Sequence, residues 1–128
     1  IQNDDDFSWS LAAGTYLVFV WLHLNGLEAG DFKCAWANTG TMTIARSSFG
    51  PAAATTDRES TLMVTRGNTS TTEQTYGVDT TGATVVKEEL LVIVDVAGTL
   101  TLQWAQGTSS ATATSVTTAS RAWVVSVA

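Results

Sequence analysis

Side chains that carry covalent and metal chemistry are scarce in this sequence, which has one cysteine, one histidine and one proline among 128 residues. The single cysteine, Cys34, excludes an internal disulfide and a cysteine-based zinc site. His23, the only histidine, has no Gly-x-Ser-x-Gly nucleophile motif elsewhere in the chain to work with. We therefore interpret His23 as a structural or subunit-contact residue. We predict that the protein is not an enzyme and has no catalytic residue, no cofactor and no metal site.

Positive charge is scarce as well. Six Lys and Arg residues stand against twelve Asp and Glu, and the formal net charge is −6. Nucleic acids and anionic membrane surfaces bind clusters of cations, whereas the cations here are scattered along the chain. The longest apolar run, Tyr16 to Leu22, is far shorter than the roughly 20 residues of a membrane-spanning helix, and we interpret it as a buried strand. The sequence therefore predicts no nucleic acid and no membrane among the partners.

The first residues lack the pattern of a signal peptide. Ile1 is followed by Gln, Asn and Asp4-Asp5-Asp6 rather than by basic and then apolar residues. The acidic run also lacks the spaced ligands and the glycine of a calcium loop. We expect residues 1–6 to form a solvated acidic lead-in that continues an arm absent from the given sequence.

What the sequence does contain is Thr, Ser, Ala and Val in abundance, with 45% hydrophobic and only 14% charged residues. Thr and Val suit half-buried pleated surfaces, and the length fits one domain over 1–128 with a single core. Apolar alternation and turn residues predict an all-β fold of roughly eight strands, a β-sandwich or barrel. The expected strands are 7–11, 15–24, 32–37, 41–44, 61–66, a short one near 76, 85–96, 98–107 and 122–128, with a loop over 46–59.

One of these strands has an alternative. Lys87-Glu-Glu-Leu-Leu91 within 85–96 is compatible with a helix, but the many Val and Ile residues around it favour a strand. In a strand, neighbouring side chains point to opposite faces, so Glu88 and Glu89 are not expected to act together as a carboxylate pair. By the same alternation Cys34 shares a face with Phe32 and Trp36, which predicts a buried, inert thiol.

The five tryptophans all fall in strand patterns, so packing in the core or at a subunit interface is the default expectation for each. An exposed tryptophan would instead indicate binding of a sugar or a partner. We predict four buried core residues near the C-terminus: Leu102, Trp104, Trp123 and Val125.

The C-terminal third also carries a resemblance. Ala97-Gly-Thr-Leu-Thr-Leu-Gln-Trp-Ala-Gln106 is followed by the small-residue tract 108–120 and a hydrophobic terminal strand. This order resembles the C-terminal signature of the jelly-roll structural proteins of tailed bacteriophages. Asn3 to Phe7 before Ala12 to Tyr16 looks like the opening of the same proteins, and Ala29 to Lys33 with Trp36 looks like their third strand. The chain departs from them at Asn38-Thr-Gly40, where they commonly have a Pro-Gly turn, and at Ala119-Ser120, where they often have a glycine.

The resemblance implies an antiparallel jelly-roll β-sandwich that assembles as a homotrimer. The implied role is capsid decoration, in which the trimer binds the outer surface of the virion and stabilises contacts between major capsid protein subunits. An alternative is a trimeric tail-fibre or receptor-binding head domain that binds a host-surface glycan. A third class that shares the trimeric jelly roll is a cellular ligand of the tumour-necrosis-factor type. The candidate capsid or subunit contacts are Asp4, Asp5, Asp6, Phe7, Thr108, Ser109, Thr112 and Thr114.

Overall fold

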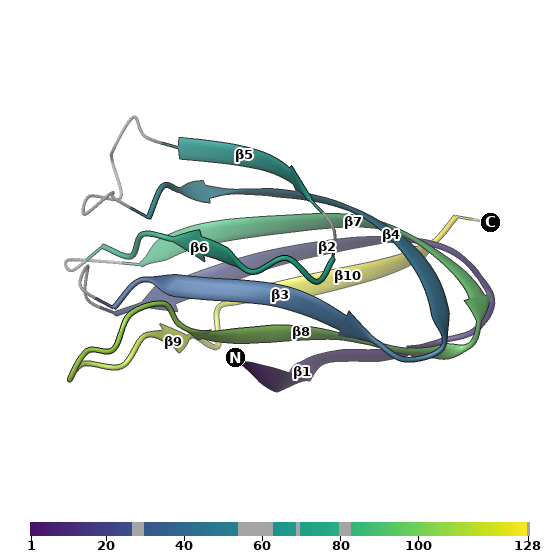
Figure 1. The fold of residues 1–128 in the computed structure, drawn as a ribbon, viewed down its shortest axis with the longest axis horizontal. Helices are drawn as coiled ribbons and strands as arrows, with labels where there is room; N and C mark the ends of the chain where they lie inside the picture. Colours follow the sequence, from purple (N-terminus) through teal and green to yellow (C-terminus); the bar gives the residue numbers. More distant parts are fainter. Residues whose placement is uncertain (27–29, 54–62, 69, 80–82, 128) are drawn as a thin grey trace.

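The fold is all-β. A computed structural model describes residues 1–26, 30–53, 63–68, 70–79 and 83–127, with the side chains of 63–66 and 68 left aside. These residues form two antiparallel sheets that face each other across one core (Figure 1). The strands are β1 (Gln2–Leu11), β2 (Gly14–Asn25), β3 (Phe32–Asn38), β4 (Thr41–Pro51), β5 (Met63–Asn68), β6 (Gln74–Tyr76), β7 (Thr84–Val96), β8 (Gly98–Gln106), β9 (Ser115–Val116) and β10 (Arg121–Ser126).

The strand order is nested. One sheet has the order β1-β8-β3-β6, and the other has the order β10-β2-β7-β4-β5, with the short β9 paired to β2. The first strand therefore pairs with the eighth, the second with the seventh, the third with the sixth and the fourth with the fifth. From β1 to β8, consecutive strands lie in opposite sheets except for β4 and β5. The register of β2 on β7 runs without a shift from Gly14 opposite Val94 to Leu24 opposite Thr84.

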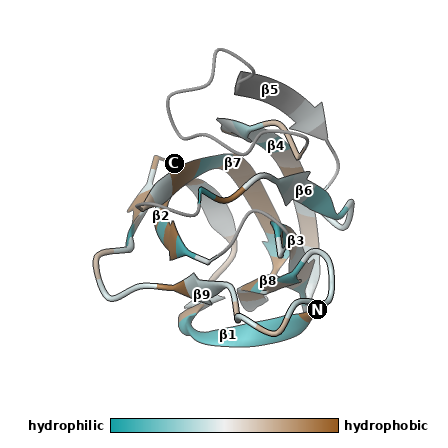
Figure 2. Cartoon of the chain, turned by 90° about the vertical axis from the view of Figure 1, so that its left-hand side faces the viewer, coloured by the Kyte–Doolittle hydropathy of each residue, from teal (hydrophilic) through white to brown (hydrophobic). Residues whose placement is uncertain are grey.

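Strand β7 confirms the strand interpretation of 85–96 over the helix. Its side chains alternate, with Val86, Glu88 and Leu90 buried and Lys87 and Glu89 exposed. A helix would have put these neighbours on overlapping faces instead. Coloured by hydropathy, β7 carries long hydrophobic stretches whereas β1 is largely hydrophilic (Figure 2).

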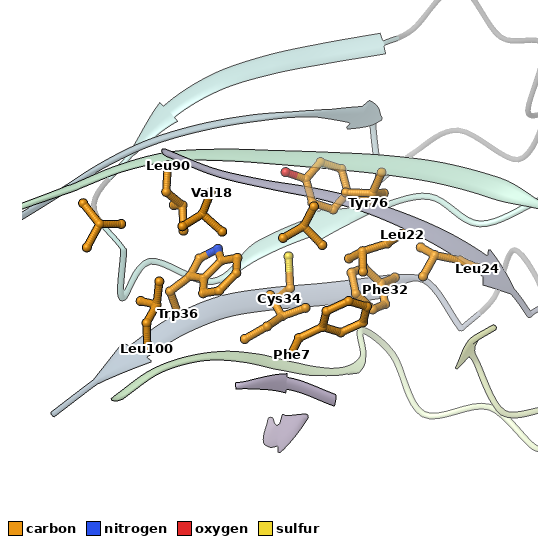
Figure 3. Close-up of a cluster of buried hydrophobic side chains, with 14 of the residues drawn as sticks. Phe7, Val18, Leu22, Leu24, Phe32, Cys34, Trp36, Tyr76, Leu90 and Leu100 are labelled. Carbon is orange, nitrogen blue, oxygen red and sulfur yellow. The ribbon is translucent and has the colours of Figure 1, made fainter. Parts of the chain in front are cut away.

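The core lies between the two sheets (Figure 3). Phe32 and Trp36 from β3 pack in the same layer as Leu22 and Leu24 from β2. Leu102 is fully buried, as its position in the alternating pattern predicts, and Trp104 is partly buried against the core. Cys34 is fully buried, which confirms the expected structural thiol.

Two of the predicted core residues are wrong. Trp123 and Val125 are 51% and 47% exposed, because Ala122 and Val124 take the inward positions of β10. In the register with β2, Trp123 lies opposite Phe19, which also points outward. Since every residue from Ala122 to Val125 is apolar, the sequence of this strand does not reveal which alternate set faces the core.

Two predicted boundaries are also wrong. Strand β4 continues to Pro51, whereas the sequence predicts a loop from residue 46. The prediction fails because the inward positions Arg46 and Ser48 are polar, so the usual alternation of apolar and polar residues is not visible there. Strand β1 begins at Gln2, so residues 2–6 belong to the strand rather than to a lead-in before it, and Gln2 and Asn3 pair with β8. The remainder of the expected loop, 54–59, and the start of the expected strand at 61–62 lie outside the described residues. The described strands number ten rather than roughly eight.

Candidate functional site

The most polar part of the interior is an ion pair between Arg46 of β4 and Glu88 of β7, both with fully buried side chains. The guanidinium binds the carboxylate through two nitrogens, with Nε at 2.7 Å from Oε2 and Nη2 at 2.9 Å from Oε1. Arg46 Nη1 also donates to the carbonyl oxygen of Thr72 at 2.6 Å. A charge-assisted, two-point contact of this kind fixes the geometry of both side chains.

Three further donors surround the same carboxylate. Trp36 Nε1 donates to Glu88 Oε2 at 3.2 Å, and Cys34 Sγ and the Tyr76 hydroxyl donate to Oε1 at 3.3 and 3.4 Å. Figure 3 shows the Cys34 sulfur and the Trp36 indole nitrogen pointing from β3 toward the opposite sheet. We call these five residues the buried network. It ties β3 and β6 of one sheet to β4 and β7 of the other, and its carboxylate is saturated with donors.

The electrostatics of the buried network favour a structural role for its residues over a role as reactive groups. Burial raises the pKa of the Cys34 thiol well above its usual value, and the neighbouring Glu88 charge raises it further. Burial also raises the pKa of the Tyr76 hydroxyl, again with a contribution from Glu88. Burial is the largest single influence on the pKa of Arg46 and lowers it, but the hydrogen bond to Glu88 and the nearby negative charge together raise the pKa above its usual value. A nucleophilic cysteine needs a lowered pKa and access to solvent, and Cys34 has neither.

A second feature lies on the outside of the six-stranded sheet. Most of the large hydrophobic side chains that the described chain exposes lie there, on β2, β4, β7 and β10. We call this surface the apolar face and define it by Phe19, Trp21, Phe49, Leu91, Ile93, Trp123 and Val125.

Register makes the apolar face continuous. Phe19 of β2 lies between Trp123 of β10 and Glu89 of β7, and the next row along β2 places Leu17 between Val125 and Leu91. Directly opposite residues on one face of a sheet are close enough to contact each other. Monomeric proteins rarely expose a contiguous apolar patch of this width, and those that do commonly use it for binding.

Charged groups sit within the apolar face in two neighbouring rows. Trp21 lies opposite Lys87 on one side and Arg121 on the other. The Lys87 ammonium lies 5.1 Å from the centre of the Trp21 ring, and the ring of His23 stacks on Trp21 at 6.0 Å. The side chains of Trp21, Lys87, Glu89 and Trp123 border a shallow hollow of about 160 Å³. Aromatic rings beside charged groups in such a hollow can bind a sugar ring or a protein side chain.

A third feature is a larger groove of about 460 Å³ on the side where β1 and β10 form the sheet edges. Asp4, Trp9, Trp104 and Arg121 are among its lining residues. Asp4 is already engaged, because its Oδ2 accepts a hydrogen bond from Trp104 Nε1 at 2.7 Å and its Oδ1 accepts from two backbone amides of its own strand. The carboxylate therefore holds β1 on β8 across a register shift.

The predicted contact residues divide by exposure. Asp5, Asp6, Thr108, Ser109 and Thr112 are exposed, and Asp4 is half-buried. Phe7 and Thr114 are not available for contact, which corrects that part of the prediction. Phe7 packs in the core as an inward residue of β1, and Thr114 is buried while its hydroxyl donates to the carbonyl oxygen of Asp31 at 2.8 Å. The groove is lined by Asp4, Asp6 and Phe7 but by none of the predicted residues from 108–114, so the two segments do not form one site there.

Sequence reasoning missed the apolar face. It interpreted Tyr16 to Leu22 as a buried strand, yet Phe19 and Trp21 of this run are exposed. The available signal was apolar residues in both alternate sets of β7, since Leu91 and Ile93 are out of phase with Val92 and Val94. A strand that is apolar on both faces needs a cover on both.

The described part of the chain contains no group of three or more His, Cys, Asp or Glu side chains placed to hold a metal ion. Among the same residues, no helix has the length and apolar character to cross a membrane. Comparison with known proteins gave no match, since no protein-family model, curated protein or solved structure is significantly similar to this chain. What the protein does is therefore inferred from its own sequence and geometry.

Proposed function

We propose that this chain is a capsid decoration protein of a tailed bacteriophage. In this proposal it assembles as a homotrimer, sits on the outer surface of the virion and binds neighbouring major capsid protein subunits without catalysis. The observation that carries the proposal is the apolar face, a surface suited to assembly on a body whose buried ion pair, Arg46 with Glu88, is already satisfied. The resemblance of the C-terminal segment to phage structural proteins supplies the biological setting.

The jelly-roll topology belongs to the same proposal. The pairing of the first eight strands as 1 with 8, 2 with 7, 3 with 6 and 4 with 5 is that of one long hairpin wound into two layers. A jelly roll is an eight-stranded double sheet of this kind. In this interpretation β9 and β10 are additions beside β2, which explains a strand count above eight.

The proposed mechanism is multivalent binding. A trimer that contacts several capsid subunits at once gains effective concentration from each contact, so modest individual contacts suffice. A ligand that binds only the mature shell also stabilises that shell by mass action. The acidic character of the chain, with its scattered cations, suits a position away from the packaged nucleic acid.

A second candidate is a fibre-tip or receptor-binding domain that binds a host-surface glycan. It is favoured by the exposure of Trp21 and Trp123, which border the same hollow as Lys87 and Glu89. Exposed aromatic rings flanked by polar groups stack on sugars. The aliphatic part of the apolar face, with Leu91, Ile93 and Val125, extends well beyond such a hollow and fits a protein partner better.

The copy number of this chain relative to the major capsid protein, measured by quantitative mass spectrometry of purified virions, tests the proposal. Hundreds of copies in a simple ratio to the shell protein support decoration. A handful of copies per particle overturns it in favour of the tail position, for which a glycan-binding screen follows. Absence of the chain from virions overturns both.

A further inference from the structure

We infer that the apolar face binds a second copy of this chain, so that the outer surface of β10-β2-β7-β4 is the contact that builds the oligomer. This inference rests on the proposed function and deepens it, because it names the surface and the partner in the homotrimer. The partner is identified by the size of the apolar surface and by the charges on it.

The size of the surface fits a stable protein contact. The seven side chains that define the apolar face are each 38% to 51% exposed. At these fractions they present together on the order of 600 Å² of apolar surface, since a large aromatic side chain carries roughly 150–250 Å². That area equals or exceeds the largest apolar patch of a typical monomer, about 300–600 Å². It supplies most of the roughly 800 Å² that each partner contributes to a standard interface.

The charges favour another copy of the chain. Of the six cations and twelve acids in the sequence, the rows of the apolar face contain Lys87, Arg121 and Glu89. In the rows of Trp21 and Phe19 cations therefore outnumber acids two to one on a protein of net charge −6, and Asp95 follows Ile93 at the far end of the face. An acidic copy complements such a face, which lowers repulsion between like molecules at this surface. A contact between this face and a different, acidic surface of the next copy is heterologous, the kind that closes a ring of three.

The same charges argue against a lipid surface. Lys87 and Glu89 are neighbours on β7 within the rows that also contain Trp21 and Phe19. Insertion of this face into a membrane would desolvate both charges without providing partners for them. A protein partner can provide a counter-charge to each.

The test is the oligomeric mass of the full chain. Sedimentation velocity and light scattering across a dilution series should show a species of three chains, each of 13.5 kDa, that dissociates on dilution. Acrylamide quenching of tryptophan fluorescence reports whether the apolar face is covered, because Trp21 and Trp123 are exposed to solvent in the single chain. Quenching should increase as the oligomer dissociates.

Variants locate the contact. Trp123→Arg places a charge where the next copy should pack, and we expect the dissociation constant to rise at least about 30-fold, as for an interface hot spot. Val125→Lys, one position further along the same face of β10, is a second variant in case the first fails to fold. Ser10→Arg is the matched control, since it adds the same charge at an exposed position of the edge strand β1 on the opposite sheet. Circular dichroism and a thermal melt establish that each variant is folded.

Three results overturn the inference. The first is a wild-type chain that is monomeric at every concentration. The second is an oligomer whose mass and dissociation are unchanged in folded Trp123→Arg and Val125→Lys, which moves the contact elsewhere and leaves the proposed function to the copy-number measurement. The third is a monomeric chain that sediments with phosphatidylcholine vesicles, with binding lost in Trp123→Arg, which assigns the face to a lipid surface.

Discussion

The two outer faces of this sandwich differ in polarity, because one exposes polar side chains and the other exposes apolar ones. On the four-stranded sheet, small and polar side chains face outward and bind each other across strands: Ser8 Oγ lies 2.8 Å from Thr101 Oγ1, and the Gln103 amide donates to Asn3 at 2.9 Å. On the six-stranded sheet the outward positions hold large apolar side chains with no cover in the described chain. One face is complete as a solvent-facing surface, and the other is built to be covered.

Because of this difference, the polar face bears on the stability of the single chain, whereas the apolar face bears on its assembly with a partner. Polar partners on the four-stranded sheet are satisfied within the chain, so this face needs nothing further to remain in water. The apolar face gains free energy only when another surface removes it from water. Substitutions on the two faces should therefore have different consequences even where they change the same property.

The largest effect is expected from the buried network, which lies between the two faces and supports both. Arg46→Met leaves the Glu88 carboxylate buried without its counter-ion and should lower the free energy of unfolding by about 3–5 kcal/mol. Urea denaturation monitored by circular dichroism measures it. Ser47→Ala, an exposed neighbour on the same strand, should change the free energy by less than about 0.5 kcal/mol. If Arg46→Met lowered the free energy of unfolding by less than about 1 kcal/mol, the ion pair would not hold the two sheets together.

The next largest effect compares a tryptophan that faces inward with one that faces outward. Trp104 is partly buried, stacks on Phe32 with ring centres 6.0 Å apart and donates to Asp4. Because it is not fully buried, Trp104→Ala should cost about 2–3 kcal/mol, below the range for a core tryptophan. Trp123→Ala should cost less than about 1 kcal/mol in the dissociated chain and act on assembly instead. Equal costs for the two, measured by denaturation at high dilution, would contradict the assignment of faces.

A charge reversal on each face gives a smaller and more specific contrast. Lys87→Glu removes the cation over Trp21 and makes the apolar face negative on an acidic chain. Self-association should weaken about tenfold, which corresponds to about 1.4 kcal/mol. Lys33→Glu is the matched control, because Lys33 is on the other sheet and pairs with Glu73 at 3.3 Å. Added salt should shrink the difference between wild type and Lys87→Glu, and equal effects of the two reversals would argue against a charge-sensitive contact at the apolar face.

The smallest effect is expected on the polar face. Ser8→Ala deprives the hydroxyl of Thr101, a buried residue, of its partner and should cost about 1 kcal/mol. The double variant Ser8→Ala with Thr101→Val removes both partners and should return close to the wild-type stability. Thermal melts measure both, with the oligomeric mass unchanged in either. A double variant less stable than the single one would mean that packing, not the hydrogen bond, dominates this contact.

Most of the strands are predictable from the sequence, because a half-buried strand alternates and this chain alternates clearly around Phe32, Cys34 and Trp36. The failures have specific causes. Beyond Ile44, strand β4 turns Arg46 inward, and the only signal that a charge there is tolerated is Glu88, which lies 42 residues away. Sequence separation of this size hides the pairing, since nothing local links the two side chains.

An all-β chain with a buried thiol at Cys34, and with Glu88 and Glu89 on opposite faces, follows from the amino-acid sequence alone. These properties follow from the two-residue period of a strand, which is local. Which face of an apolar strand is covered depends instead on how the strands pair in the folded chain. In β10 every position from Ala122 to Val125 is apolar, and the pairing with β2 selects Ala122 and Val124 for the interior. The apolar face exists because pairing places the outward residues of four strands side by side, and that depends on register across the sheet rather than on any one segment.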